Sequence, residues 1–275
     1  MKTEGDLMVV YVLIFFLAIL CVTVIYFLFQ ETTGVQIKKV KVDSKKVKDR
    51  IKILHLSDIH FKREGIKEQK IIEVTSEYDF DLVVFTGDYI KEKPKYLLPF
   101  SDFLQRLKFN CPAFAVTGNH DYRLDISKIE QIFEGQGIEL LLNRTCLQEV
   151  KGTTFKITGV EDPVTGHDDL HSAFKAGQNG EFNLLLAHSY DILDFIEPYM
   201  EIDLLLAGDT HGGQLNVGRK LTKALQRFEF LAGKYEVDEV IMYITRGIGT
   251  SLFPFRFRAR PEITILELYS KKNNN

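Results

Sequence analysis

Aspartate, asparagine and histidine residues recur in this sequence directly after short apolar runs. The blocks are Asp58-Ile59-His60, Gly87-Asp88, Gly118-Asn119-His120-Asp121, His188 and Gly208-Asp209-Thr210-His211, and they contain four of the seven histidines. The preceding strand-like runs are Ile51–Leu56, Leu82–Phe85, Ala113–Val116, Leu184–Leu186 and Leu204–Ala207. Oxygen and imidazole ligands on rigid strand ends can hold two divalent ions roughly 3.5–4 Å apart. The pattern therefore predicts a two-metal site at one edge of a sheet.

The spacing of these residues indicates distinct roles within the predicted site. Asp58 and His60 are two residues apart, so both can face one ion from an extended turn. Asp88 ends the next strand, where its two carboxylate oxygens can bridge two ions. His188 and His211 supply the remaining imidazole nitrogens. Such a ligand set is typical of a metal-dependent phosphoester hydrolase.

The block around Asn119 supplies a further ligand and the expected catalytic groups. The amide oxygen of Asn119 suits a second divalent ion. His120 follows Asn119 directly and is expected to point elsewhere, so that it is free to act on the substrate. We expect Asp121 to orient His120 or to help keep it protonated.

The elements that carry these residues alternate between strands and helices, which predicts an α/β layered fold. Helices are expected over 66–78, 94–109, 125–133, 170–176 and 190–197. Three consecutive strands are expected over 138–142, 145–150 and 154–160, with a turn at Lys151-Gly152. A hairpin over 228–244 should turn near Val237-Asp238, and a last strand should cover 262–268. Mixed strand directions are therefore expected.

Taken in order, the blocks resemble the signature of the calcineurin-like metallophosphoesterases, which runs D-x-H, G-D, G-N-H-D, H, G-H-x-H. Each block alone occurs by chance, whereas the ordered set, with each block after a strand, is specific. The resemblance covers about Ile51 to Leu268. Four further stretches, 157–163, 210–214, 246–251 and 261–264, resemble a narrower membrane-associated bacterial branch. That branch includes phosphodiesterases and a UDP-diacylglucosamine pyrophosphatase of lipid A synthesis.

The resemblance implies a four-layer αββα sandwich with the metals at the sheet edge. By motif position, the first ion is held by Asp58, His60, Asp88 and His211, and the second by Asp88, Asn119, His188 and Asp209. It further implies in-line attack on phosphorus by a water activated between the ions, while His120 stabilises the developing charge or protonates the leaving oxygen. Manganese is the expected metal, with iron, zinc or magnesium as alternatives.

One position departs from the family pattern, because Asp209 stands where the family normally has a histidine. A carboxylate still binds a divalent ion, but it replaces a neutral nitrogen with a charged and harder oxygen. We expect a preference for manganese or magnesium over zinc and a less acidic water between the ions. The alternative is that Asp209 weakens the second ion and lowers or abolishes activity.

The N-terminal part of the chain is expected to cross a membrane. Met8 to Phe29 is an uncharged stretch of 22 residues, about 33 Å long as a helix and therefore able to span the hydrocarbon core. The alternative is a cleaved signal peptide, but the run exceeds the usual apolar region of about 7–15 residues and no small-residue cleavage site follows it. We therefore expect a retained anchor.

Basic residues flank this span unequally. Lys2 is the only one before it, whereas seven follow between residues 38 and 50: Lys38, Lys39, Lys41, Lys45, Lys46, Lys48 and Arg50. This excess predicts that the large domain lies on the cytoplasmic side, and the lysines can also contact anionic headgroups. The apolar residues Val35, Ile37, Val40 and Val42 also suggest a strand with the lysines on its solvated face.

The expected organisation is a short tail (1–7), a transmembrane helix (8–29), a basic connector with the first strand (30–50), the metallophosphoesterase domain (51–269) and a polar tail (270–275). The net charge of −3 provides no basic field, so no nucleic acid partner is expected. Cys21, Cys111 and Cys146 form no CxxC pair, which favours a reduced environment, although the spacing leaves a Cys111–Cys146 bridge open.

Other conspicuous residues are explained more simply by structural roles. His55 lies within a predicted strand and is expected to be a core or edge histidine. His167 and His171 flank a predicted helix start, where Asp168 or Asp169 is expected to act as the cap.

Three arginines, Arg256, Arg258 and Arg260, alternate with Phe255, Phe257 and Ala259 on an extended segment. They either receive phosphate groups near the metals or form a solvated strand face, and we favour the solvated face slightly. Gly247 and Gly249, before this segment, are expected to permit tight turns near the site.

The sequence thus predicts a single-pass, membrane-anchored binuclear metallophosphoesterase that cleaves a phosphodiester or pyrophosphate bond. The expected location is a bacterial inner membrane, with a lipid-linked substrate at the inner leaflet. UDP-diacylglucosamine is one candidate substrate, and a soluble nucleotide or another phosphodiester is the enzymatic alternative. Two competing functions stay open: a non-catalytic scaffold with the same fold, favoured only by Asp209, and a nuclease.

Overall fold

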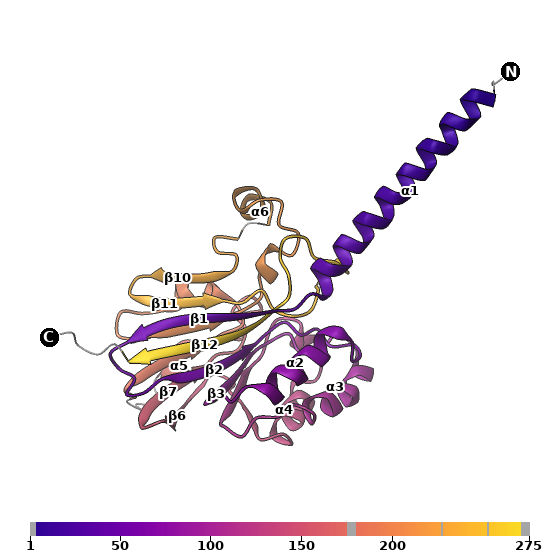
Figure 1. Cartoon of the computed structure of the whole chain (residues 1–275). Coiled ribbons are helices and arrows are strands. Elements are labelled where there is room, and N and C mark those ends of the chain that lie inside the picture. The colour runs from indigo at the N-terminus through magenta and orange to yellow at the C-terminus, as the bar shows by residue number, and fades with distance from the viewer. Residues whose placement is uncertain (1–3, 175–179, 227, 252, 271–275) are drawn as a thin grey trace.

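The computed structural model describes residues 4–174, 180–226, 228–251 and 253–270, and it consists of one projecting helix and two packed sheets (Figure 1). The helix, α1 (Glu4–Thr33), has 30 residues and is therefore about 45 Å long. Its most apolar window is not buried against any described part of the chain, and α1 is long and apolar enough to cross a membrane. It exceeds the predicted 8–29 segment at both ends. Because it exposes its apolar side chains along its length, it is suited to a lipid environment.

Each sheet contains six strands of mixed direction. The first has the order β1-β12-β2-β3-β4-β5, with β1 (Gln36–Ser44), β2 (Ile51–Leu56), β3 (Leu82–Thr86), β4 (Ala113–Val116), β5 (Ile138–Leu140) and β12 (Glu262–Ser270). The second has the order β10-β11-β9-β8-β7-β6, with β6 (Arg144–Val150), β7 (Thr153–Gly159), β8 (Phe182–Leu186), β9 (Leu204–Ala207), β10 (Gly233–Val237) and β11 (Val240–Ile244). The predicted mixture of strand directions is confirmed.

Three apolar clusters separate four layers. Alternate residues of one strand, such as Val83 and Val84, belong to different clusters because successive side chains point to opposite faces. The Val83 face packs against helices α2 (Ile66–Glu77), α3 (Leu97–Leu104) and α4 (Ile126–Glu134), while the Val84 face packs against the second sheet. The outer face of the second sheet is covered by α5 (Leu170–Phe174) and the 3₁₀ segment η3 (Tyr190–Phe195). The predicted α/β four-layer αββα sandwich is confirmed.

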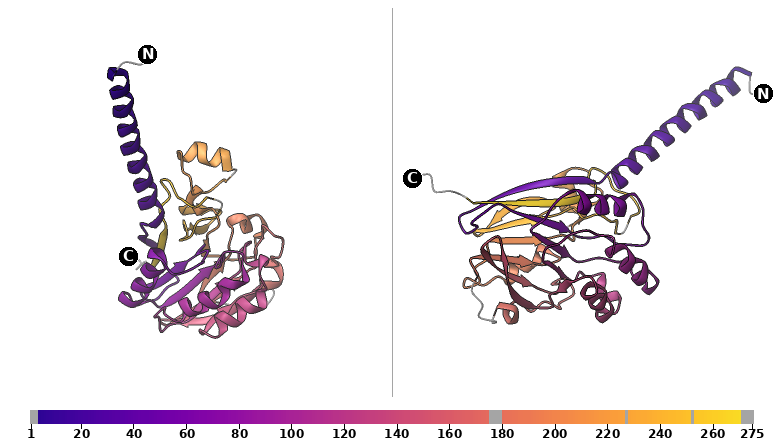
Figure 2. Two further views of the ribbon diagram at one scale, coloured as in Figure 1. Left: turned by 90° about the vertical axis from the view of Figure 1, so that its right-hand side faces the viewer. Right: turned by 60° about the horizontal axis from the view of Figure 1, so that its bottom comes forward.

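The strand directions bring the start of β1 to the sheet edge where several other strands end. β1 is parallel to β12, and β12 is antiparallel to β2. Strands β3 and β4 run parallel to β2. The carboxyl ends of β2, β3 and β4 therefore lie at the same edge as the beginning of β1, where α1 joins the domain (Figures 1 and 2).

Several expected elements differ from the observed ones. The helix predicted over 94–109 begins as the 3₁₀ turn η1 (Pro94–Tyr96), continues as α3 and ends at Leu104, because the chain must turn to enter β4 at Ala113. The helix predicted over 190–197 is the 3₁₀ segment η3. The last two residues of the predicted 170–176 helix, and residues 271–275 of the polar tail, lie outside the described residues. Helix α6 (Arg219–Gln226) was not predicted.

Other expectations hold. The lysine-bearing segment after α1 is indeed strand β1, with Lys38, Lys39 and Lys41 exposed and Val40 and Val42 buried. The hairpin β10–β11 turns at Asp238 and Glu239, and the turn at Lys151-Gly152 joins β6 to β7. The three cysteines are free, so no Cys111–Cys146 bridge is present.

His55 is a core residue, as predicted. It is fully buried in β2, and its Nε2 lies 2.8 Å from the hydroxyl of Thr86. Burial lowers the pKa of His55 from 6.5 to about 3, because the charged imidazolium is poorly solvated in the interior.

This buried imidazole should make the fold sensitive to acid. Between pH 6.5 and about 3 the unfolded chain binds a proton at His55 that the folded chain excludes, so lowering the pH favours unfolding by about 1.4 kcal/mol per unit. We expect His55→Gln to flatten the loss of thermal stability between pH 6.5 and 4, measured by calorimetry in detergent. His171→Gln, which alters an exposed histidine beside Tyr199, is the control. Equal acid sensitivity of both variants would contradict the prediction.

Candidate metal centre

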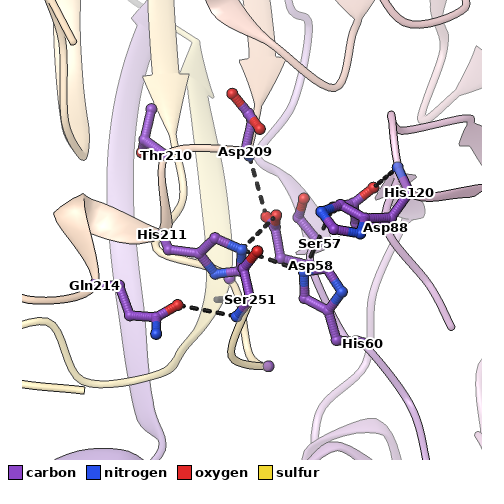
Figure 3. A network of polar contacts seen from close by, with 12 residues as sticks. Ser57, Asp58, His60, Asp88, His120, Asp209, Thr210, His211, Gln214 and Ser251 are labelled. Carbon is purple, nitrogen blue, oxygen red and sulfur yellow. Dashed lines mark hydrogen bonds and ion pairs between the residues drawn. The ribbon is translucent and has the colours of Figure 1, made fainter. Parts of the chain in front are cut away.

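The residues predicted to hold metal follow the ends of β2, β3, β4, β8 and β9, which belong to both sheets. They are Asp58, His60, Asp88, Asn119, His188, Asp209 and His211. Figure 3 shows five of them close together: Asp58, His60, Asp88, Asp209 and His211. Ligands about 2.1 Å from one ion are separated from each other by roughly 3.0–3.4 Å. Their spacing can therefore be compared directly with that of a coordination shell.

The first cluster consists of Asp58, His60 and His211. The Nε2 atoms of His60 and His211 are 3.2 Å apart, and the Nε2 of His211 lies 3.4 Å from Oδ1 of Asp58. The two imidazoles are stacked, with centroids 5.1 Å apart. Three donor atoms at these separations can hold one divalent ion.

The carboxylate of Asp88 lies between this cluster and a second one. Its Oδ2 is 3.4 Å from Nε2 of His60, while its Oδ1 is 3.6 Å from Nε2 of His188. Each oxygen therefore faces a different imidazole. This is the geometry required of a carboxylate that bridges two ions.

The second cluster contains His188 and Asp209, and the predicted ligand Asn119 lies on the adjoining loop between β4 and α4. The Nε2 of His188 lies 3.6 Å from Oδ1 of Asp209. The Nδ1 of His188 is 2.7 Å from the carbonyl oxygen of Thr86 and donates to it, which leaves the lone pair of Nε2 free for a metal. Asn119 lies between Gly118 and His120, both of which contact Asp88, and its amide oxygen is buried without a partner among the described residues.

The electrostatics of the two clusters suit cations. Oδ1 of Asp58 and Nε2 of His188 are buried, and no hydrogen-bond partner is described for either. Burial raises the pKa of Asp58 and raises that of Asp88 well above its usual value, and neighbouring carboxylates add to both shifts. Burial alone would lower the pKa of His188, but Asp88, Asp58 and Asp209 raise it well above normal. The residues present therefore fit two divalent ions.

The backbone at the site adopts unusual conformations that its residue types tolerate. Five of the predicted ligands have positive φ: Asp58 (51°), His60 (45°), Asp88 (58°), Asp209 (65°) and His211 (51°). Aspartate and histidine are enriched in this left-handed region relative to other non-glycine residues. Such conformations persist where the surrounding structure imposes them, and they cluster at functional sites.

Glycines allow other segments to approach Asp58 closely. A Cβ on Gly208 would collide with Ser57 and Asp58, and one on Gly247 would lie 2.5 Å from the Cβ of Asp58. Gly247 also has a φ of 63°, which a residue with a side chain adopts only with strain. The expectation that glycines permit close turns near the site is confirmed for Gly247.

His120 lies at the rim of the site and contacts a carboxylate that the sequence did not indicate. Its Nε2 is 3.9 Å from Oδ2 of Asp88, and its Nδ1 is 2.5 Å from Oε1 of Glu92. Burial lowers the pKa of His120, while Glu92 raises it. Glu92 is held in turn by Arg123 at 2.6 Å.

Among the described residues, the carboxylate of Asp121 makes no hydrogen bond to the imidazole of His120, so its expected role as the orienting group is corrected. Its carboxylate is fully buried and accepts hydrogen bonds from the backbone amides of Asp88 (2.8 Å), Tyr89 (3.1 Å) and Gly118 (2.9 Å). Burial raises its pKa to about 6. Asp121 therefore holds together the two loops that carry Asp88 and Asn119.

The expectation of a solvated arginine face is wrong for Arg256. Its side chain is fully buried behind the metal centre, and it donates to the carbonyl oxygens of Gly249 (2.6 Å), Arg246 (2.8 Å) and Ala259 (2.9 Å). Its Nη2 also lies 3.1 Å from Nδ1 of His211. Arg256 therefore positions a ligand instead of receiving phosphate.

The remaining histidines lie outside the clusters. His167 stacks on Tyr122 with ring centroids 3.9 Å apart, and His171 contacts the hydroxyl of Tyr199 at 2.8 Å. Asp169 caps helix α5 by accepting from the amide of Ser172, as predicted.

Two adjoining clusters of candidate ligands that share a carboxylate, between the ends of two packed sheets, are the arrangement expected of a metallophosphoesterase. The family model for calcineurin-like phosphoesterases matches residues 51–213, and the chain belongs to this family. It is therefore a hydrolase that uses divalent metal ions.

Its relatives include membrane and bacterial proteins. The chain is 28% identical to metallophosphoesterase YkoQ of Bacillus subtilis, over 87% of this chain and 92% of the relative. It is 33% identical to phosphodiesterase YaeI of Escherichia coli, over 79% and 82% respectively. A Danio rerio transmembrane protein with a metallophosphoesterase domain is 28% identical, over 79% of this chain and 53% of the relative. Among solved structures, an NAD nucleotidase of Haemophilus influenzae is similar at a TM-score of 0.49 and 15% identity, over 72% of this chain and 45% of that one.

The contact between Glu92 and His120 predicts a specific kinetic effect. In Glu92→Gln the charge that raises the pKa of His120 is lost, so the protonated imidazole should persist only to lower pH. We expect kcat to fall on the order of tenfold with little change in KM, and the alkaline limb of the pH profile to move to lower pH. Glu73→Gln, which removes a surface partner of Lys70, is the control. A fall in kcat with an unmoved alkaline limb would contradict this role.

The carboxylate of Asp209 predicts the metal preference. Asp209→His restores a neutral nitrogen opposite His188, so we expect activity to shift from manganese or magnesium toward zinc and the pH optimum to fall. Titration of activity with each metal across pH provides the test. Asp191→Asn removes a nearby carboxylate that contacts Ser189, and it should leave the preference unchanged. Unchanged metal preference and pH optimum in Asp209→His would count against the prediction.

Proposed function

We propose that this chain is a single-pass, membrane-anchored metallophosphoesterase that cleaves a phosphodiester or pyrophosphate bond of a lipid-linked substrate. One observation carries the proposal: the sheet edge that holds the ligand clusters is the edge at which α1 joins the domain. A substrate held in the bilayer beside α1 would therefore meet the metal centre without leaving the membrane surface.

Contacts between the end of α1 and the domain support a defined orientation. Glu31 pairs with Arg260 at 2.6 Å and accepts from the amide of Arg258 at 2.7 Å. The hydroxyl of Thr32 accepts from the amide of Arg256 at 2.9 Å. Because the arginine segment also supports His211, the orientation of the anchor and that of the site are linked.

Exposed apolar side chains on α6 support contact with a bilayer. Leu221 is 54% exposed and Leu225 is 69% exposed, and residues four apart share one face of a helix. Helix α6 projects from the same side of the domain as α1 (Figures 1 and 2). Lysines at 220 and 223 accompany this apolar face, as in helices that rest on anionic membranes.

The basic residues after α1 support a cytoplasmic location of the domain. Lys38, Lys39 and Lys41 are exposed on β1, which begins three residues after α1 ends. An excess of lysine after the span favours retention of that flank in the cytoplasm, and near the surface each lysine contributes about 1 kcal/mol with anionic headgroups. The bacterial relatives support a bacterial inner membrane.

The chemistry divides among the residues at the site. One divalent ion would be held by Asp58, His60, Asp88 and His211, and a second by Asp88, Asn119, His188 and Asp209. Manganese is the expected metal. When bound, these ions would polarise a phosphoryl oxygen and activate water. His120 faces the site from the rim and would protonate the leaving oxygen or stabilise its charge. Glu92 keeps the His120 imidazole oriented.

The class of substrate that is cleaved distinguishes the proposed lipid-linked phosphohydrolase from the competing functions. UDP-diacylglucosamine is the specific lipid-linked candidate, and a soluble nucleotide or simple diester is the competing substrate class. A scaffold without catalysis is opposed by the contact of Asp209 with His188, since this contact completes the second ligand cluster. Near-neutral charge disfavours nucleic acid.

Hydrolysis by the purified full-length protein provides the test. With manganese present, we expect release of UMP and lipid phosphate from UDP-diacylglucosamine in mixed micelles. Asp88→Asn should lower this rate on the order of 100-fold or more, because even outer-shell changes cost about 10–100-fold. Cleavage of small chromogenic diesters alone would contradict the lipid-linked assignment, and cleavage of DNA would favour a nuclease.

A further inference from the structure

A cavity of about 410 Å³ lies between the metal centre and the end of α1. Its lining includes His60 from the first ligand cluster, Thr33 from the last turn of α1, and three cationic residues, Lys62, Arg63 and Lys67. We call this cavity the basic pocket. Its volume falls within the range of about 300–1,000 Å³ that is usual for small-molecule sites.

The three cations of the basic pocket have no described ionic partner. The nearby acidic side chains are engaged elsewhere: Glu64 with Arg106 and Gln69, Glu68 with the amide of Gly65, and Glu31 with Arg260. Among the described residues, no hydrogen bond or ion pair joins these carboxylates to Lys62, Arg63 or Lys67. The lining of the pocket therefore carries three cationic side chains against one carboxylate, that of Glu68, and has an excess of positive charge.

Of the three cations, Lys67 has the properties most typical of a ligand-binding group. Burial lowers its pKa to about 8, and the charges of Arg256 and Lys62 add to this shift although Glu68 opposes it. The pKa of His211 is lowered mainly by burial and by the charge of Arg256, and the charge of Lys67 contributes to the same shift. The ammonium is thus partly desolvated and electrostatically coupled to a metal ligand, a state that a bound anion would stabilise.

We propose that the basic pocket binds a second anionic group of the substrate, the phosphate adjacent to the one that reacts at the metal centre. This inference rests on the proposed function and specifies its substrate class as a compound with two neighbouring phosphates. A single isolated phosphodiester would leave the pocket unfilled.

The position of the pocket also specifies the direction of the substrate. The reacting phosphate lies beside His60 and the second phosphate beside Lys67, so the chain of the substrate continues toward Thr33 at the end of α1. Ile66, which is 59% exposed, and Pro254 line the same cavity and offer apolar contacts to the group beyond the second phosphate. A phosphate headgroup of the bilayer has the same chemistry and is the competing source of the anion.

Three substrates distinguish these two sources in the full-length protein with manganese. Bis(p-nitrophenyl) phosphate has one phosphate, UDP-glucose has two and is soluble, and UDP-diacylglucosamine has two and is lipid-linked. The measured quantity is the ratio of kcat/KM for each two-phosphate substrate to that for the one-phosphate substrate. We expect this ratio to fall on the order of tenfold in Lys67→Met, since a hydrogen bond to a charged group is lost.

Two further variants control the experiment. Lys67→Arg keeps a cation in the pocket and should retain most of the ratio. Lys70→Met alters a lysine on the same helix, paired with Glu73 at the surface, and should leave the ratio unchanged. Equal losses on all three substrates in Lys67→Met would show a merely supporting role for Lys67 and overturn the proposal, as would an unchanged ratio.

The remaining outcomes separate this inference from the proposed function. Cleavage of UDP-glucose without cleavage of the lipid-linked substrate would contradict the lipid assignment, while a lowered UDP-glucose ratio in Lys67→Met would still support the pocket. Cleavage of the chromogenic diester alone would overturn both. Lys67→Met could instead lower kcat/KM only in nanodiscs with anionic lipid, and equally for one-phosphate and two-phosphate substrates. That result would identify a bilayer headgroup as the bound anion and overturn the substrate site.

Discussion

The structure depends on a cluster of buried carboxylate and imidazole groups at one sheet edge. Asp58, Asp88 and His188 are almost completely buried, and removal of such charges from water costs several kcal/mol each unless other charges compensate. Burial accordingly raises the pKa values of both carboxyl groups. Divalent cations relieve this cost, and the close approach of the loops at Gly208 and Gly247 is what makes so dense a cluster of ligands possible. The metals are thus part of the stability of this edge as well as of its chemistry.

A second dependence links this edge to helix α1. The segment that follows β11 carries Arg256, whose guanidinium supports His211, and Arg260, which pairs with Glu31 at the end of α1. The aromatic ring of Phe257 in the same segment lies 6.0 Å from that of Phe27. One short stretch of chain therefore contacts both His211 in the first cluster and the last turns of α1. The end of α1 is consequently packed against the domain and is not joined to it by a free linker.

Much of this arrangement was predictable because it depends on local sequence patterns. The strand-end blocks predicted the carboxylates and imidazoles that lie close together at this edge, and alternating apolar residues identified most strands, including β1 with its exposed lysines. What could not be predicted depends on contacts between distant segments. Glu92 lies 28 positions from His120 and has no pattern around it, so the carboxylate nearest in sequence, Asp121, was assigned the role instead. Arg256 alternates with apolar residues as a solvated strand would, and only the packing of the segment against the site buries it. Helix α6 was missed because its eight residues are mostly polar and its two leucines face outward.

The extra carboxylate at Asp209 and the basic pocket have opposite electrostatic effects on an anionic substrate. A third carboxylate beside the ions reduces the net positive charge that attracts the reacting phosphate, relative to the neutral histidine that the family pattern has at this position. Lys62, Arg63 and Lys67 restore positive charge a short distance away, on the side of the site toward α1. In the proposed substrate complex, binding energy comes from a phosphate that does not react, and energy of this kind can be used to position the reacting group. A substrate with a single phosphate cannot use the second interaction, so Asp209 and the basic pocket together support the proposed preference for a substrate with neighbouring phosphates over a simple diester.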